Sequence, residues 1–115
     1  MFHVRFYETS EGKKPVEEFL VCLDNKVRTK AIHELMLLRQ KGPQLREPFS
    51  KAMGNGIFEL RVQSGGSAAR IFYFFYVGSR IILTNGFVKK TRRTPPGELE
   101  KARRYKDDYE RRHNG

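Results

Sequence analysis

Residues 57–96 read IFELRVQSGGSAARIFYFFYVGSRIILTNGFVKKTRRTPP, and this stretch decides the fold. It holds three apolar runs, and each of them begins or ends at a basic residue. In the first run Phe58, Leu60 and Val62 alternate with polar neighbours, which is the pattern of a half-buried strand. The second run, residues 70–77, is dense in aromatic and β-branched side chains and too short for a membrane span, so we expect a central strand.

A third strand follows the glycine at position 78. Gly78-Ser79 separates the second run from residues 80–84, and a two-residue loop that begins with glycine predicts a hairpin. The three runs are therefore expected to form an antiparallel meander. Its last strand leads into residues 87–93, FVKKTRR, where basic side chains are concentrated.

The N-terminal part predicts one strand and two helices. Apolar residues alternate within residues 1–7, as in a short strand. Pro15 suits a first helical turn, and the apolar spacing that follows predicts a helix of about three turns. Asp24 is expected to cap a second helix, which ends at Gly42-Pro43. Residues 43–56 are expected to form an ordered loop.

A last helix is predicted from Gly97 to Arg112, after two prolines. The element order is then β-α-α-β-β-β-α. This order indicates an α+β fold, with a small antiparallel or mixed four-stranded sheet and the two N-terminal helices on one face. The last helix is expected at an edge of the sheet or on its second face. One domain is expected to span residues 1–115.

Composition restricts the class of protein. The chain has 115 residues and a formal charge of +10, and such a surface attracts polyanions, nucleic acid above all. The single cysteine excludes an internal disulfide and suits a reducing cytoplasm. Cys22 itself is expected in the core, beside the apolar stripe of its helix. We find no leader, no membrane anchor and no metal-ligand spacing among the histidines, cysteine and acidic residues.

Four segments together resemble the RelE/ParE toxin superfamily, and within it the HigB-type phage-derived toxins. The resemblance covers nearly the whole chain, because the element order also matches that fold. The segments are Gly56-Ile57-Phe58-Glu59-Leu60-Arg61, Ala69-Arg70-Ile71-Phe72-Tyr73, Gly86-Phe87-Val88-Lys89-Lys90, and Pro95-Pro96-Gly97-Glu98-Leu99 with Ala102.

The resemblance implies a cytoplasmic toxin of a type II toxin–antitoxin system. Such a toxin is a ribosome-dependent messenger-RNA endonuclease that needs no metal and no cofactor. Its partners would be the ribosome, messenger RNA and a cognate helix-turn-helix antitoxin similar to HigA, which neutralises the toxin. Operator DNA would be bound only through the antitoxin, and no membrane is involved.

The resemblance also assigns candidate catalytic residues. Arg61 and Arg70 would clamp the scissile phosphate, while Lys89 or Lys90 would stabilise developing charge or move protons. The alternative is that all four are solvated charges at the sheet edge. RNA-binding candidates are the basic residues that follow, namely Arg92, Arg93, Arg103 and Arg104. The mixed charges of the last helix are equally typical of a solvated face.

The chain departs from these relatives where the last helix begins. Residues 96–99 lack the tyrosine or histidine that RelE and HigB toxins use, so the general base has no candidate. Tyr105 and Tyr109 have the spacing of core residues, and His113 is expected in a frayed tail. The alternative function is a ParE-like inhibitor of a protein target, or a basic binding module without catalysis.

Overall fold

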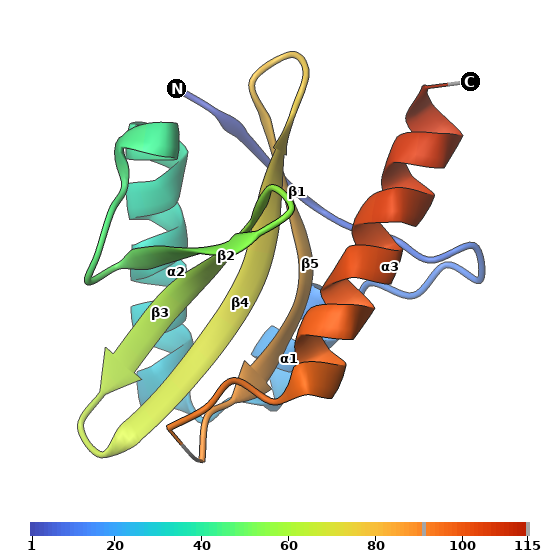
Figure 1. The fold of residues 1–115 in the computed structure, drawn as a ribbon. Helices are drawn as coiled ribbons and strands as arrows, with labels where there is room; N and C mark the ends of the chain where they lie inside the picture. The colour runs from blue at the N-terminus through green and yellow to red at the C-terminus, as the bar shows by residue number, and fades with distance from the viewer. Residues whose placement is uncertain (91, 115) are drawn as a thin grey trace.

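The computed structural model, which describes residues 1–90 and 92–114, forms a mixed sheet with helices on both faces (Figure 1). The five strands of the described chain lie in the order β1-β5-β4-β3-β2. They are β1 (His3–Phe6), β2 (Ser50–Gly54), β3 (Ile57–Ser64), β4 (Ser67–Tyr76) and β5 (Arg80–Val88). The helices are α1 (Pro15–Cys22), α2 (Asn25–Lys41), the short 3₁₀ helix η1 (Gly42–Gln44) and α3 (Pro96–His113).

The meander predicted from the sequence is confirmed. β3 pairs antiparallel with β4 from Ile57 opposite Phe74 to Ser64 opposite Ser67, and β4 pairs antiparallel with β5. The loop between β4 and β5 is longer than the two residues that we expected. Tyr76 pairs with Arg80, so the turn contains three residues, and both Gly78 and Ser79 have positive φ.

The prediction of a four-stranded sheet missed β2, which lies in the segment expected to be a loop. Ser50–Gly54 pairs antiparallel with β3, and a bulge between Ala52 and Gly54 shifts the register. The connecting residues Asn55 and Gly56 have φ values of 55° and 78°. Asn-Gly with both φ angles positive is a favoured two-residue hairpin turn, so this signal was present in the sequence.

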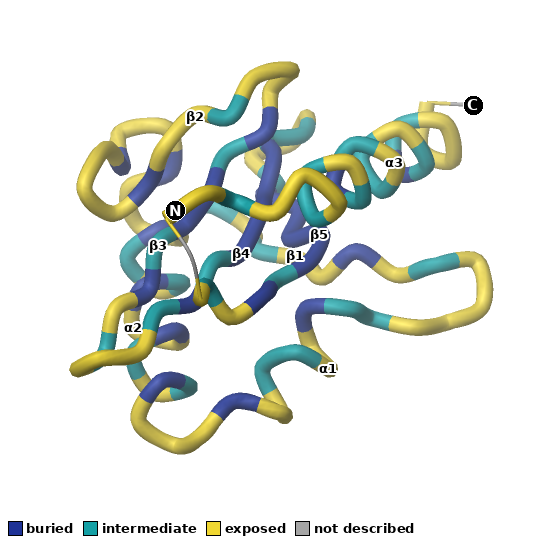
Figure 2. Tube along the Cα trace, turned by 60° about the horizontal axis from the view of Figure 1, so that its bottom comes forward, coloured by how far each residue is buried: buried dark blue, intermediate teal, exposed yellow. Residues whose placement is uncertain are grey.

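Alternation along the central strands produces two apolar faces. Leu60, Tyr73 and Leu83 pack with α1 and α2 on one face, whereas Ile57 and Phe72 pack with α3 on the other. Figure 2 shows the buried residues concentrated in the strands between these layers. The last helix therefore covers the second face, which was one of the two positions expected. Glu59 and Arg61 belong to that face because they alternate with Leu60.

The helix boundaries follow the predicted signals. Pro15 begins α1, the Asp24 side chain accepts a hydrogen bond from the Val27 amide at the start of α2, and Gly42 caps its end. One expectation for this region was wrong, because Cys22 is exposed. It is the last residue of α1, and its side chain lies outside the apolar contact that Val16 makes with the sheet.

Close approach explains the glycine at position 86 of β5. A Cβ atom added to Gly86 would lie 2.5 Å from Cδ2 of the Phe19 ring in α1. Any larger residue would displace this ring from the sheet, so glycine lets α1 pack directly on β5.

Aromatic contacts join α3 to the first strand region. The Tyr7 hydroxyl donates a hydrogen bond of 2.6 Å to Asp108, and its ring stacks on Tyr105 with centroids 4.5 Å apart. Burial, helped by Asp108, raises the pKa of Tyr7 to about 12. Tyr109 is buried, as its spacing predicted. His113 differs from the expected frayed tail, since it ends α3 and stacks on Tyr109 at 3.9 Å.

Among the helices of the described residues, none is both long enough and apolar enough to cross a membrane.

Candidate functional site

Two arginines lie side by side on the sheet face that α3 partly covers. Arg61 of β3 is the direct cross-strand partner of Arg70 in β4. Side chains of such a pair project to the same face, only about 5 Å apart at Cβ. Two like charges at this separation repel, so the arrangement requires a compensating anion.

Glu59 supplies that anion. Its side chain is only 1% exposed, and one carboxylate oxygen, Oε1, lies 3.6 Å from Nε of Arg61 and 3.6 Å from Nε of Arg70. Its other oxygen accepts a hydrogen bond of 2.7 Å from the Thr94 hydroxyl, in the segment that leads to α3. Both arginine Nε–H groups are buried, and neither has a hydrogen-bond acceptor in the described part of the chain. Because both Nε–H groups are buried beside Glu59, a bound anion would contact the outer Nη groups instead.

Lys89 joins the arginines from the end of β5. Its amide donates a 2.8 Å hydrogen bond to the Ala68 carbonyl, so pairing with β4 continues one residue beyond Val88. Burial lowers the pKa of Lys89 most, the positive charge of Arg70 lowers it further, and Glu59 partly opposes both effects. Lys51 adds a smaller repulsion, since it is the cross-strand partner of Glu59. We call Lys51, Arg61, Arg70 and Lys89, arranged around Glu59, the basic cluster.

A second carboxylate lies at the margin of the basic cluster. Glu47 Oε1 is 3.5 Å from Nη1 of Arg61, and its side chain is 67% exposed. It precedes β2 and faces solvent, in contrast to the enclosed Glu59. Glu47 was not predicted as a site residue. It lies in an irregular segment, and no pattern in the surrounding sequence indicates that this segment contacts β3.

The remaining candidates are dispersed. Lys90 and Arg92 are exposed in the segment after β5, as is Arg93, while Thr91 of the same segment lies outside the described residues. On α3, Arg104 is exposed, whereas Arg103 is half-buried and its Nε–H has no acceptor within the described part of the chain. The structure thus brings Arg61, Arg70 and Lys89 together and leaves Lys90 further into solvent.

The basic cluster has the electrostatic properties that phosphate chemistry requires. Arginine presents a planar set of donors that matches phosphate oxygens, and partial burial strengthens each charge interaction. Burial also lowers the pKa of Arg70, but a guanidinium remains protonated at physiological pH. A lysine with a lowered pKa beside two such groups is suited to proton transfer.

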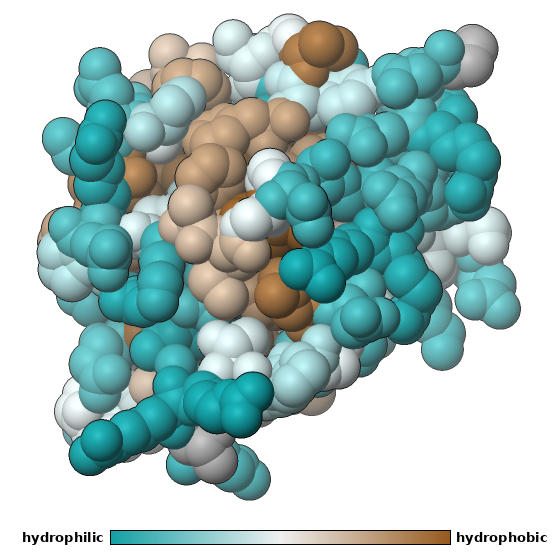
Figure 3. Space-filling model, in the orientation of Figure 1, coloured by the Kyte–Doolittle hydropathy of each residue, from teal (hydrophilic) through white to brown (hydrophobic). Residues whose placement is uncertain are grey.

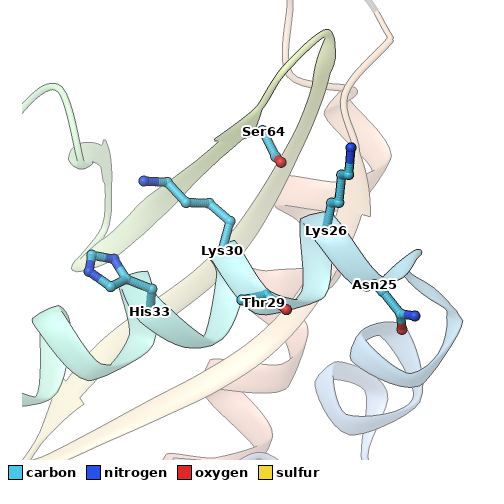
Figure 4. A pocket seen from close by; sticks show the side chains of 6 residues that line it. All are labelled: Asn25, Lys26, Thr29, Lys30, His33 and Ser64. Carbon is cyan, nitrogen blue, oxygen red and sulfur yellow. The ribbon is translucent and has the colours of Figure 1, made fainter.

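A hollow of about 540 Å³ lies elsewhere, between α2 and the end of β3. Figure 4 shows Lys26, Lys30 and His33 along one side of α2, with Ser64 on the strand. None of the basic cluster lines this hollow. The phosphate chemistry described above therefore does not use this hollow.

A family model matches most of the chain. It is the model described as phage-derived protein Gp49-like (DUF891), and it matches residues 18–107, which run from α1 to the middle of α3. All four residues of the basic cluster lie inside the matched range. No curated protein matches the chain.

We predict that Glu59→Gln lowers the free energy of unfolding by about 2 kcal/mol, because two neighbouring guanidinium groups lose their buried counter-charge. The loss is smaller than for a fully enclosed ion pair, since Arg61 retains contact with solvent. Chemical denaturation measures the change. Glu47→Gln is the matched control and should cost less than about 0.5 kcal/mol, as expected for an exposed ion pair. Equal losses for the two variants would contradict this account of Glu59.

Proposed function

Because this chain belongs to the Gp49-like family of phage-derived proteins, a family associated with toxin–antitoxin systems, we propose that it is a toxin that cleaves messenger RNA on the ribosome. The observation that supports cleavage is the convergence of Arg61, Arg70 and Lys89 around the buried Glu59. The proposed reaction is an attack of the ribose 2′-OH on the adjacent phosphorus, with no metal or cofactor.

This reaction has three chemical requirements. A base must remove the proton of the 2′-OH, cations must stabilise the phosphorane, and an acid must protonate the departing 5′ oxygen. The P–O5′ bond breaks as the O2′–P bond forms. The products are a 2′,3′-cyclic phosphate and a 5′-OH end.

The cluster supplies groups for the second and third requirements. Arg61 and Arg70 would hold the non-bridging oxygens of the scissile phosphate through their outer Nη–H groups, since their Nε–H groups are buried beside Glu59. Glu59 holds both guanidinium groups in place. Lys89 would protonate the 5′ oxygen, because its lowered pKa makes it a better acid than an ordinary lysine.

Glu47 would serve as the base, and it replaces the tyrosine or histidine that the last helix does not provide. It is the exposed carboxylate beside Arg61, so a ribose hydroxyl can reach it. Glu59 is unsuited to this step, because it is enclosed and accepts the Thr94 hydrogen bond.

The exposed basic residues would bind neighbouring phosphates. Lys90, Arg92 and Arg104 are exposed, and phosphate contacts from such residues make the affinity for RNA fall steeply with salt. Arg93 belongs to the same exposed segment. These residues position the RNA and take no part in proton transfer.

The proposed partner that controls the toxin is a helix-turn-helix antitoxin similar to HigA, acting in the cytoplasm. Operator DNA would be bound through this antitoxin. The family's association with toxin–antitoxin systems supports such a partner. Co-purification of the chain with the product of an adjacent reading frame tests the pairing, and the absence of any complex would reject it.

We predict that Lys89→Ala slows cleavage of ribosome-bound messenger RNA by about 100-fold, because the leaving oxygen loses its acid. Lys90→Ala is the matched control, and it should slow cleavage by no more than about threefold through weaker RNA binding. Primer extension and an assay for 2′,3′-cyclic phosphate ends measure both. Growth arrest without RNA cleavage by the wild-type chain would instead support a ParE-like protein target.

The rate of cleavage should also depend on the ionisation of Lys89. Because the pKa of Lys89 lies below its ordinary value of 10.5, the protonated acid is lost as the pH rises through that lowered pKa. We therefore expect the single-turnover rate to fall on the alkaline side, at a pH below the 10.5 of an ordinary lysine. Lys89→Arg stays protonated throughout, so this fall should disappear. Identical pH profiles would exclude Lys89 as the acid.

Glu47→Gln should slow cleavage by about 100-fold or more, since an amide cannot accept the proton of the 2′-OH. Thermal unfolding of the same variant should be close to that of the wild type, which separates a chemical defect from a folding defect. Wild-type cleavage rates in Glu47→Gln would show that another group is the base.

A further inference from the structure

A second hollow lies on the α3 side of the sheet, next to the turn between β2 and β3. Its volume is about 390 Å³. Asn55 of the turn and Ile57 of β3 form one side, and residues of the middle of α3 form the other. The lining residues from α3 are Arg103, Lys106 and Asp107.

One polar group that lines this hollow has no hydrogen-bond partner among the described residues. The Nε–H of Arg103 is buried and has no hydrogen-bond acceptor within residues 1–90 and 92–114. Asp107 lies one helical turn further along α3, where an ion pair with Arg103 would be ordinary. No ion pair within 4.0 Å joins these two side chains. A buried donor without an acceptor is costly, so a ligand that satisfies it gains affinity.

The hollow is adjacent to the basic cluster. Ile57 and Glu59 are two residues apart on β3 and project to the same face, a separation of roughly 7 Å along the strand. Figure 3 shows hydrophobic surface between β2 and the hydrophilic side chains of α3. A nucleotide next to the scissile phosphate could therefore place its base here.

The chemistry of the lining favours a base over a phosphate. Asp107 is exposed and would repel an anion. Lys106, the second cation, is already paired with Glu110 at 3.0 Å. Ile57, which is buried against α3, adds no charge to the wall of the hollow.

We propose that this hollow is a specificity site that binds the base of a guanine nucleotide flanking the scissile phosphate. The proposal rests on the proposed ribonuclease function. Arg103 donates to O6 and N7 of guanine, which is the commonest specific contact of arginine with a base. Asp107 accepts from the N1–H and N2–H groups of the same ring. No other common base presents two acceptors and two donors in this arrangement.

The test compares two neighbouring arginines of α3. Arg103→Ala removes the donor inside the hollow, whereas Arg104→Ala removes the same charge from an exposed position. Cleavage sites of the full chain are mapped by primer extension on translated messages. The preference for guanine beside the cut should fall by about tenfold in Arg103→Ala. Arg104→Ala should weaken cleavage equally at all sequences and leave the preference unchanged.

A second variant and a binding measurement guard against misfolding. Asp107→Asn alters an exposed side chain and should reduce the same preference. Backbone NMR shifts of Asn55 and Arg103 should respond to the 2′-O-methyl trinucleotide UGU more than to UUU, since blocked 2′ oxygens prevent cleavage. The response should be lost in Arg103→Ala.

The outcomes separate the two proposals. Guanine-dependent shifts without any cleavage by the wild-type chain would reject the ribonuclease and keep the base site. Cleavage with unchanged site preference in Arg103→Ala and Asp107→Asn would overturn the base site and keep the ribonuclease.

Discussion

The buried carboxylate of Glu59 is the constraint on which the candidate site depends. Arg61 and Arg70 are paired on adjacent strands, and their charges would repel without the oxygen that lies 3.6 Å from each Nε. The arrangement costs desolvation of three ionised groups, and it is a poor means of stabilising a fold. Its effect is to hold two guanidinium groups side by side, and their buried Nε–H groups have no hydrogen-bond acceptor among the described residues.

The position of α3 creates the surroundings of this carboxylate. The helix covers Ile57 and Phe72 and leaves the arginine pair at the margin of its contact with the sheet. Thr94, just before the helix, reaches Glu59. Partial cover lowers the local dielectric, which strengthens the interactions of Arg61 and Arg70 and lowers the pKa of Lys89. The same packing leaves the hollow near Asn55 open. The proposed phosphate site and base site would then both lie where α3 meets β3.

Local sequence patterns predicted the faces of the central strands and the ends of α2. Period-two alternation assigned Glu59 and Arg61 to the face opposite Leu60, and capping residues located both ends of α2. β2 was missed because Ser50–Gly54 is short and weakly apolar, although the Asn55-Gly56 turn pointed to a hairpin. Cys22 was misplaced because spacing within α1 does not reveal how far the helix end extends beyond the sheet.

The sequence by itself determined the order of the elements other than β2, the two faces of the central strands and the excess of positive charge, because each depends on residues close together in the chain. Only the tertiary structure distinguished Lys89, which lies near the arginines, from the exposed Lys90, and the half-buried Arg103 from the exposed Arg104. It alone placed Glu47 beside Arg61. These distinctions depend on how deeply each side chain is buried and on which residues from distant segments contact it. Periodicity defines which side a residue faces, whereas packing between elements defines what it meets there.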